Sequence, residues 1–269
     1  METYRLKNIV ILILALLNLF LLGLLLNFRY QRQHTAQELE EHLVQLYATY
    51  GITLPEDLDA DVPSLTPIEV SRSLSDEAAI AAYLLGEEVT GADQGGGIYT
   101  YTGQMGTVQF RSSGAFDYAP VRQDVSDPYT FYEGFLETFG YRALSSSYTE
   151  SSGTLTAVRS VNGYDVYNCT VSFRFSNRQL VSVAGSWVST ASTTALPQSS
   201  YTAADALSQF LEYRNEAGVV CNSIVSIDPA YALQSPTPST LQLSAKWLIT
   251  TDTYSYYVDC TTKEVQRTS

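Results

Sequence analysis

The stretch Leu155–Phe175, LTAVRSVNGYDVYNCTVSFRF, predicts a β-hairpin. Apolar and polar side chains alternate on both sides of Asn162-Gly163, a dipeptide typical of the two-residue turns that join antiparallel strands. Asn177-Arg178 predicts the next turn, so a third strand is expected over Gln179–Val188. An antiparallel sheet of this kind buries one face against another element, and the sequence offers helices for that role.

The same order, one helix followed by several strands, occurs three times after residue 66. Each helix has a polar start, namely Ser75, Ser126-Asp127-Pro128 and Ser200-Tyr201-Thr202. We therefore expect an α+β fold of three helix-plus-antiparallel-sheet units, in which each helix covers its own sheet. The expected helices span 75–85, 126–139 and 200–214. The expected strands span 98–102, 107–111, 115–118, 155–161, 164–175, 179–188, 223–231, 241–250 and 254–259.

Two segments between these elements are interpreted as irregular. Gly95-Gly96-Gly97 lacks the Gly-Lys-Ser/Thr ending and the following helix of a phosphate-binding loop, so it is expected to be a flexible connector. Gln234–Thr240, QSPTPST, is expected to be a mobile loop within the last unit.

The first third of the chain predicts a membrane attachment. Ile9–Phe28, IVILILALLNLFLLGLLLNF, holds no charged residue and is about as long as a helix that crosses a bilayer core of roughly 30 Å. The residues that follow are bulky and basic, with no small-residue cleavage site, so we expect a retained anchor and not a cleaved signal. Basic residues flank both ends. The length and acidity of the following chain favour a cytoplasmic N-terminus and an extracytoplasmic bulk.

A juxtamembrane helix is expected after the anchor. Thr35–Glu38 has the pattern of a capping box, apolar side chains follow at helical spacing, and Gly51 can end the helix. The Pro- and Asp-rich segment Ile52–Thr66 predicts a solvated loop. Its alternating acids resemble the start of a calcium loop, but neither the glycine nor the closing glutamate of that loop is present. The expected divisions are a tail at 1–8, the anchor at 9–28, the helix at 29–51, a first α+β unit at 52–122 and two further units at 123–269.

Composition excludes some partners. The net charge of −13 makes nucleic acid an unfavourable ligand, so none is expected. The three cysteines, Cys169, Cys221 and Cys260, lack Cys-x-x-Cys spacing, which excludes a zinc ribbon. They are either three small buried residues or one disulfide with a spare thiol.

No motif in the chain predicts catalysis. The two histidines, His34 and His42, are too far apart on a helix to share a metal ion, and no nucleophile elbow or Ser-x-x-Lys motif is present. We expect no catalytic, cofactor or metal site and interpret the chain as non-enzymatic.

The candidate contact residues lie in two places. Asn18 is the only polar side chain well inside the anchor, and it lies with Ile11, Leu14, Leu21 and Leu25 at a three-four spacing that resembles a helix-packing seam. Two large residues on expected strands, Trp187 and Trp247, are either core residues or partner hot spots.

Three stretches carry a resemblance to a known family. Tyr99–Phe110, YTYTGQMGTVQF, with Ser113–Phe116, SGAF, resembles the meander of the YycI/YycH family. Trp247–Val265, WLITTDTYSYYVDCTTKEV, resembles the closing hairpin of that family, an ending shared with PepSY-like modules. Asn162–Tyr167, NGYDVY, is similar to the middle strands of such a module. Lys263 departs from the pattern, because the family usually has glycine there.

The resemblance implies a non-enzymatic regulator at the cell membrane. Members of this family modulate an essential sensor histidine kinase of Gram-positive bacteria through transmembrane-helix and ectodomain contacts. The expected partners are therefore a membrane sensor histidine kinase, a paralogous accessory protein as a further candidate, and the lipid bilayer. The alternative is a PepSY-like binding or inhibitory module that acts on a secreted or cell-wall protease.

Overall fold

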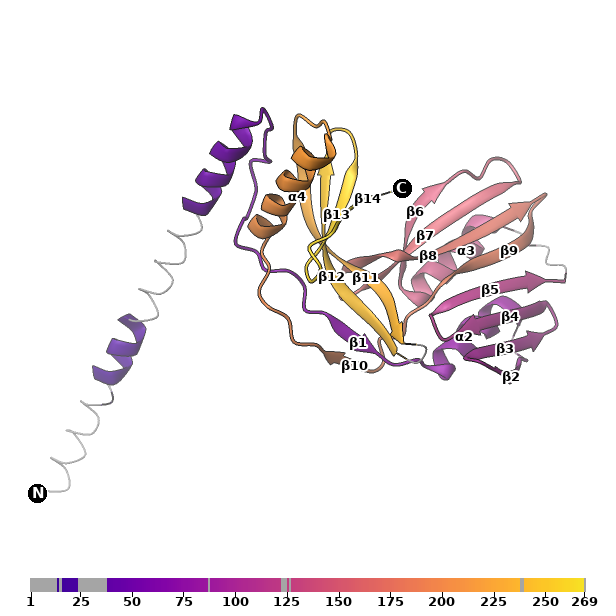
Figure 1. Cartoon of the computed structure of the whole chain (residues 1–269). Coiled ribbons are helices and arrows are strands. Elements are labelled where there is room, and N and C mark those ends of the chain that lie inside the picture. The colour runs from indigo at the N-terminus through magenta and orange to yellow at the C-terminus, as the bar shows by residue number, and fades with distance from the viewer. Residues whose placement is uncertain are drawn as a thin grey trace, which may run out of the picture.

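The computed structural model describes residue 14 and residues 16–23, 38–86, 88–121, 125, 127–237 and 240–268. The fold is α+β, as predicted, and its sheet is largely antiparallel. The strands form one hydrogen-bonded network with two parts, which we call the distal part and the proximal part. Within the described residues these parts join where β8 pairs with β11, with Val166 opposite Tyr231 in parallel register (Figure 1).

The distal part is an eight-stranded antiparallel sheet. Its order is β2-β3-β4-β5-β9-β8-β7-β6. The predicted turns at Asn162-Gly163 and Asn177-Arg178 are confirmed, and all four residues have positive φ. The bounds are β2 Thr90–Gly95, β3 Ile98–Gly103, β4 Gly106–Arg111, β5 Ala115–Pro120, β6 Tyr141–Ser146, β7 Gly153–Val161, β8 Tyr164–Ser176 and β9 Gln179–Ser186.

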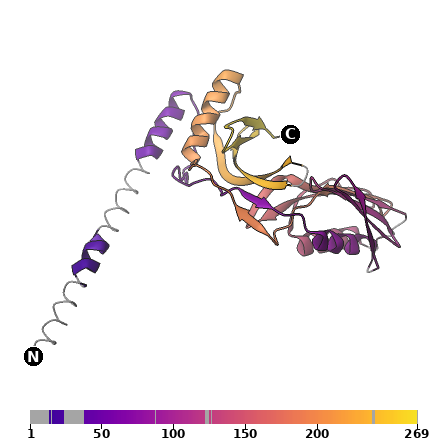
Figure 2. The same cartoon turned by 60° about the horizontal axis from the view of Figure 1, so that its bottom comes forward.

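Two helices, α2 (Leu74–Leu85) and α3 (Pro128–Phe139), cover the same face of this sheet (Figure 2). They share one core, in which the ring centroids of Phe135 and Phe173 lie 5.0 Å apart and Tyr83 contacts Phe131. The expectation that each helix covers its own sheet is therefore wrong for the first two units. The reason is the long-range pairing of β5 with β9, which joins strands β2–β5 and strands β6–β9 into one sheet.

Several local expectations change in detail. The side chain that caps α2 is Ser73, which accepts from the Asp76 N–H, and not Ser75. Asp127 caps α3 as expected, and Ser126 lies outside the described residues. The glycine triplet 95–97 is not a loose connector, because its three left-handed residues form the turn between β2 and β3.

The proximal part is built around β12 (Thr240–Thr251). This strand pairs with β11 (Ile224–Thr237) along one edge, and with β1 (Ile68–Val70) and β13 (Ser255–Asp259) in succession along the other. The expected loop at 234–240 is wrong over Gln234–Thr237, which extends β11, whereas residues 238–239 lie outside the described residues. The remaining elements are β10 Thr193–Ala195, α4 Ala203–Ala217 and β14 Val265–Arg267.

The N-terminal helix over residues 38–49 packs on the proximal part beside α4 (Figures 1 and 2). Leu43 and Tyr47 are buried in the core of α4, β12 and β13, and the Tyr47 hydroxyl donates to the Leu207 carbonyl over 2.8 Å. Residues 38–70 and 193–268 therefore form the proximal part together, and the distal part is inserted between them.

The segment that follows this helix, residues 50–66, is a strap across the proximal part. Ile52, Leu58 and Ala60 are buried in the same core, whereas the three aspartates at 57, 59 and 61 are exposed. Bridges from Thr53 to Ser223 and from Pro63 to Thr202 fix its path. The solvated-loop expectation is therefore only half right, and residues 52–66 pack with the last unit instead of the first.

Most of the expected anchor lies outside the described residues. Leu14 and residues 16–23 are helical and exposed, and Leu25 falls in the part that is not described. The helices within the described ranges include none that is both long and apolar enough to span a bilayer.

The packing of the N-terminal helix yields a stability prediction. Replacing Tyr47 with alanine removes a fully buried ring and its hydrogen bond, and we expect it to lower the free energy of unfolding by about 3–5 kcal/mol. Urea unfolding of the full chain in detergent measures this change. The control is Val44→Ala on the exposed side of the same helix, for which we expect about 0.5 kcal/mol or less. Equal effects of both substitutions would contradict the docking.

Candidate functional site

A groove of about 650 Å³ lies between the distal and proximal parts. Its volume is in the range of protein ligand sites, roughly 300–1,000 Å³. One wall comes from the distal sheet, from Leu144, Thr156, Val158, Asp165, Tyr167, Asn168 and Thr170. The other comes from the proximal sheet, from Leu248, Ser255, Tyr257, Gln266, Arg267 and Thr268.

Strand alternation explains why these side chains face the groove. On β12, Trp247 and Ile249 lie in the core beneath α4, so Leu248 between them points to the opposite side. On β7, Leu155 and Ala157 lie in the core beneath α2 and α3, so Thr156 points away from the helices. The groove is thus formed by the two sheet faces that no helix of the described residues covers.

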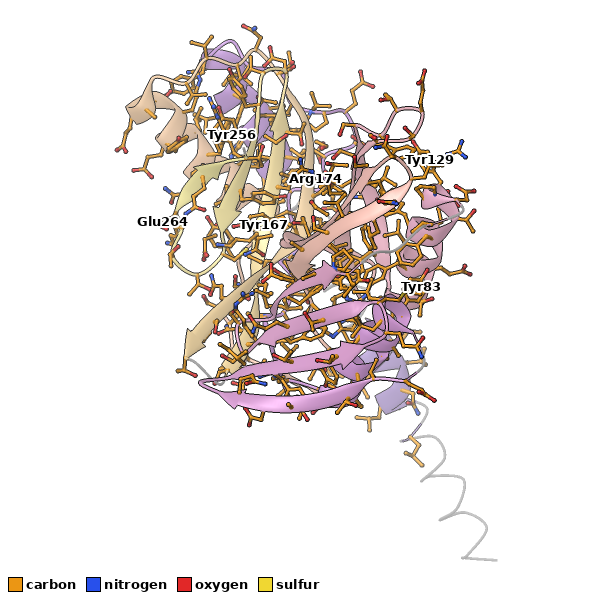
Figure 3. The ribbon with its side chains drawn as sticks, turned by 90° about the vertical axis from the view of Figure 1, so that its right-hand side faces the viewer. Tyr83, Tyr129, Tyr167, Arg174, Tyr256 and Glu264 are labelled. Atoms are coloured by element: carbon orange, nitrogen blue, oxygen red, sulfur yellow. The ribbon has the colours of Figure 1, made fainter. Side chains whose placement is uncertain are left out.

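An irregularity in β8 shapes the floor of the groove. Thr170 pairs with Val158 and Val166 with Arg159, so residues 167–169 have no register partner on β7. Bulges of this kind redirect side chains. Here the ring of Tyr167, which is labelled in Figure 3, stacks on Tyr257 of β13, with centroids 3.9 Å apart and planes at 22°.

The hydroxyl of Tyr257, one of the two stacked tyrosines, stays uncharged at physiological pH. Burial raises the pKa of Tyr257 to about 12, and the neighbouring Tyr167 and Asp165 act in the same direction. The phenol therefore remains a neutral hydrogen-bonding group.

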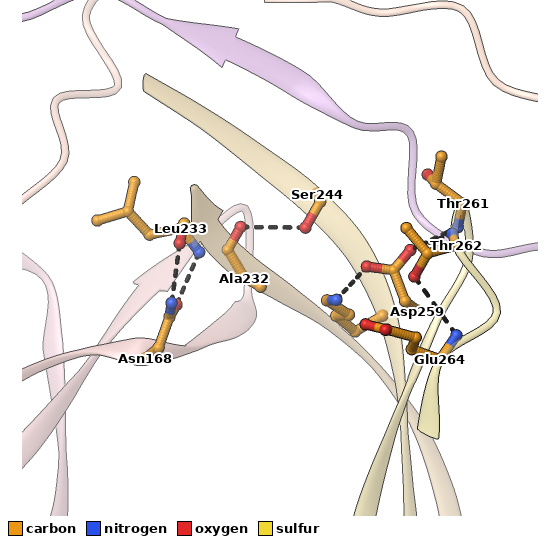
Figure 4. A network of polar contacts seen from close by, with 9 residues as sticks. Asn168, Ala232, Leu233, Ser244, Asp259, Thr261, Thr262 and Glu264 are labelled. Carbon is orange, nitrogen blue, oxygen red and sulfur yellow. Dashed lines mark hydrogen bonds and ion pairs between the residues drawn. The ribbon is translucent and has the colours of Figure 1, made fainter. Parts of the chain in front are cut away.

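Asn168 joins the two parts next to this stack. Its amide donates to the Leu233 carbonyl over 2.8 Å and accepts from the Leu233 N–H over 2.7 Å (Figure 4). The side chain thereby makes the hydrogen bonds that a neighbouring strand would make to β11. Both polar atoms of the Asn168 amide, the nitrogen and the oxygen, therefore form hydrogen bonds within the fold.

Charges in the groove are few and balanced. Arg142 on β6 forms an ion pair with Asp165, and the Arg267 guanidinium lies 4.2 Å from the ring centroid of Tyr254. The Arg142 side chain is 60% exposed, so this pair contributes little to stability. The lining is nearly neutral, in contrast to the net charge of −13 of the whole chain.

A buried ion pair between Lys246 and Asp259 supports the proximal wall (Figure 4). Burial opposes the ionisation of Asp259, but hydrogen bonds from Lys246 and from the Thr262 and Thr261 N–H groups outweigh it and hold its pKa below the usual value. These bonds fix the turn from β13 to β14. Lys263 lies in this turn with φ 62°, in the conformation that favours glycine.

The three cysteine thiols are buried, and burial disfavours their ionisation. All three cysteines are free and buried, so the three-buried-residue interpretation holds and the disulfide alternative does not. Burial raises the pKa of Cys169 and of Cys260 to about 12, which keeps both as thiols. Within the described ranges, no three His, Cys, Asp or Glu side chains are grouped so that they could hold a metal ion.

The structure separates the predicted contact residues. Trp187 is 9% exposed and packs against Phe139 and the Arg159 guanidinium, and Trp247 is 1% exposed in the core beneath α4. Both are core residues, so we do not carry them forward as partner contacts. On the N-terminal segment, Leu14 and Leu21 are exposed and Asn18 donates to the Leu14 carbonyl over 2.9 Å, so a contact there stays a prediction.

Sequence reasoning missed the groove residues. Tyr257 alternates with the core residues Tyr256 and Val258, which is a signal for a sheet face outside the core, whereas Tyr167 lies in the irregular part of β8 and shows no such alternation. No signal within either strand shows that the two faces meet.

The similarity of this chain to known proteins is weak. No family model matches the chain, and no curated protein matches it. An uncharacterized protein from Eubacterium rectale ATCC 33656 has a similar structure at a TM-score of 0.40 and 9% identity, over 80% of this chain and 85% of that chain. The Bacillus megaterium YpeB C-terminal domain matches at a TM-score of 0.35 and 13% identity, over 75% and 99%. Similarities this weak carry no argument about function.

Acid stability tests the buried ion pair. Because the folded-state pKa of Asp259 is lowered, its contribution to stability is present above the unfolded pKa of about 3.9 and is lost as the pH falls through the folded pKa. We expect Asp259→Asn to cost about 3–5 kcal/mol at pH 7, since Lys246 is left buried and unpaired. Between pH 5 and 2, the unfolding free energy of the variant should fall less steeply than that of the native chain. Parallel pH curves would contradict this assignment.

Hydrogen exchange tests the junction. Asn168→Ala leaves the Leu233 N–H and carbonyl without their partners, at an expected cost of about 1–3 kcal/mol. The Leu233 amide should exchange faster in this variant. The control Asn215→Ala, at an exposed position of α4, should leave that rate unchanged. An unchanged Leu233 rate in the Asn168 variant would show that the junction does not depend on this amide.

Proposed function

We propose that this protein is a non-enzymatic, single-pass membrane accessory protein that biases the signalling state of a sensor histidine kinase. In this proposal the N-terminus is cytoplasmic and the bulk of the chain is extracytoplasmic. The apolar segment Ile9–Phe28 contacts the membrane helices of the kinase, and the ectodomain makes a second contact.

The observation that carries the proposal is the docking of the N-terminal helix on the proximal part. This helix is described from residue 38, ten residues after the expected end of the anchor, and it is held by the buried Leu43 and Tyr47. A helix that only tethered the domain would not need to bury a tyrosine in the core of α4. The docking supports a role in which a displacement of the proximal part also displaces the helix that leads to the anchor.

Regulation of this kind requires a difference in free energy. An accessory protein shifts a two-state kinase only by as much as its contacts differ between the two states. A difference of about 1–3 kcal/mol changes the ratio of the states by roughly 5–150-fold. Contacts of a few side chains on the exposed anchor face and on the groove suffice for this magnitude.

A reporter of kinase output tests the proposal in cells. Replacing residues 9–28 with an unrelated apolar span, or deleting residues 38–269, should each change the output. Tyr47→Ala should change it in the same direction if docking transmits the signal, and Val44→Ala serves as the matched control. Unchanged output after both the anchor replacement and the ectodomain deletion would reject the kinase assignment.

The groove favours a second candidate function, in which the ectodomain binds and inhibits a secreted or cell-wall protease. An open groove between two sheet faces is suited to a segment of another protein. A deletion distinguishes the two functions. If the protein is a protease inhibitor, deleting it would leave kinase output unchanged and would raise extracellular proteolysis.

A further inference from the structure

We propose that the groove binds an extended, uncharged peptide segment of a partner protein, which adds as a strand to the free edge of β6. This inference deepens the proposed function, because it identifies the kind of partner segment that the ectodomain contacts. It rests on the open edges of the two sheets, on an exposed leucine and on the chemistry of the groove walls.

Two strand edges flank the groove. Within the described residues, β6 pairs only with β7 and β14 pairs only with β13, and both strands contribute lining residues. Leu144 of β6 and Gln266 and Arg267 of β14 line the same groove. A free edge presents unpaired N–H and carbonyl groups, and peptides bind such edges by adding a strand. Since β6 has six residues and β14 has three, β6 offers the longer edge.

The edge of β6 has a register shift between Ala143 and Ser145, which leaves Leu144 without a register partner on β7, and otherwise has few of the features that protect free edges in other proteins. It holds no proline or lysine, its Arg142 is engaged with Asp165, and Leu144 is 54% exposed at the groove. An exposed leucine on an open strand edge favours association with another chain. Leu144 shares the groove with Val158 and Leu248, which add apolar surface to the two walls.

The walls determine the chemistry of the segment. Between the aliphatic side chains lie the hydroxyls of Thr156, Thr170 and Ser255 and the amide of Gln266. These groups can form hydrogen bonds with polar side chains. Of the two charged lining residues, Asp165 is paired with Arg142 and the Arg267 guanidinium lies over the ring of Tyr254, so the walls hold one such cation and no cluster of charge to compensate a charged ligand. The segment that fits is therefore uncharged, with small apolar and hydroxyl-bearing residues in alternation.

Binding in the groove would also affect the relative position of the two parts. A strand held by β6 and in contact with β13 and β14 bridges the walls, which are otherwise joined through β8 and β11, Asn168 and the tyrosine stack. Because the N-terminal helix is docked on the proximal part, the bound segment would bias the orientation of the distal part relative to that helix.

A peptide selection tests the inference on the full chain in lipid nanodiscs. The probe is a display library of random nine-residue peptides, and enriched peptides are synthesised with a fluorophore for anisotropy titration. We expect uncharged sequences with alternating small apolar and Thr or Ser residues. Methylating alternate backbone nitrogens of such a peptide should weaken binding at least tenfold, because it removes strand hydrogen bonds. Bound peptide should slow hydrogen exchange in Tyr141–Ser146.

Matched variants locate the site. Leu144→Asp should weaken binding at least tenfold, whereas Val181→Asp, at a residue 43% exposed on β9 and not part of the groove lining, should leave it unchanged. Both positions are exposed, and circular dichroism verifies the fold of each variant. No enriched peptide, or equal binding by the Leu144 variant, would overturn the inference. The assay contains no kinase, so its outcome is independent of the reporter experiment.

Discussion

The burial of Tyr47 against α4 is the interaction on which the rest of the arrangement depends. The side chain is fully buried, and its hydroxyl donates to the Leu207 carbonyl. This contact brings the N-terminal helix to the C-terminal strands, and the strap that follows continues the same core through Leu58 and Ala60. The proximal part is consequently closed by residues from both ends of the chain, and the distal part is inserted between them.

The insertion explains the groove. Pairing of β5 with β9 joins the two distal meanders, and α2 and α3 then share one face of the resulting sheet. Among the described residues, no helix covers its other face or the face of the proximal sheet opposite α4. The displacement of Tyr167 and Asn168 from β7 lets β8 contact the proximal part, which sets the two open faces next to each other. The groove is thus a consequence of how the helices are distributed.

The features that the sequence predicts well are local. The Asn162-Gly163 turn follows from two adjacent residues, and the cap of α3 at Asp127 follows from a polar side chain before Pro128. By contrast, β2 has the sequence TGADQG without apolar alternation, so it becomes a strand only by pairing with β3. The sequence of the strap likewise predicts a polar loop, because its aspartates alternate with the buried Leu58 and Ala60 and dominate the pattern.

The site was less predictable than the fold, because it joins segments far apart in the sequence. Trp187 and Trp247 are candidate contact residues in the sequence because they are large, yet both side chains pack in the cores. Leu144 and Tyr257 line the groove although each is an ordinary strand residue in the sequence. Their role follows only from the meeting of two sheets, which depends on register and on an irregularity in β8.

A distance measurement between the N-terminal helix and α4 tests most directly whether the helix near the membrane is part of the ectodomain. Spin labels at Gln45→Cys and Glu212→Cys occupy exposed positions on the two helices, whereas the native cysteines are buried. Pulsed electron paramagnetic resonance on the full chain in nanodiscs should give one narrow distance distribution. A broad distribution, as expected for a helix that moves freely relative to α4, would contradict the docking and with it the proposed link between groove and anchor.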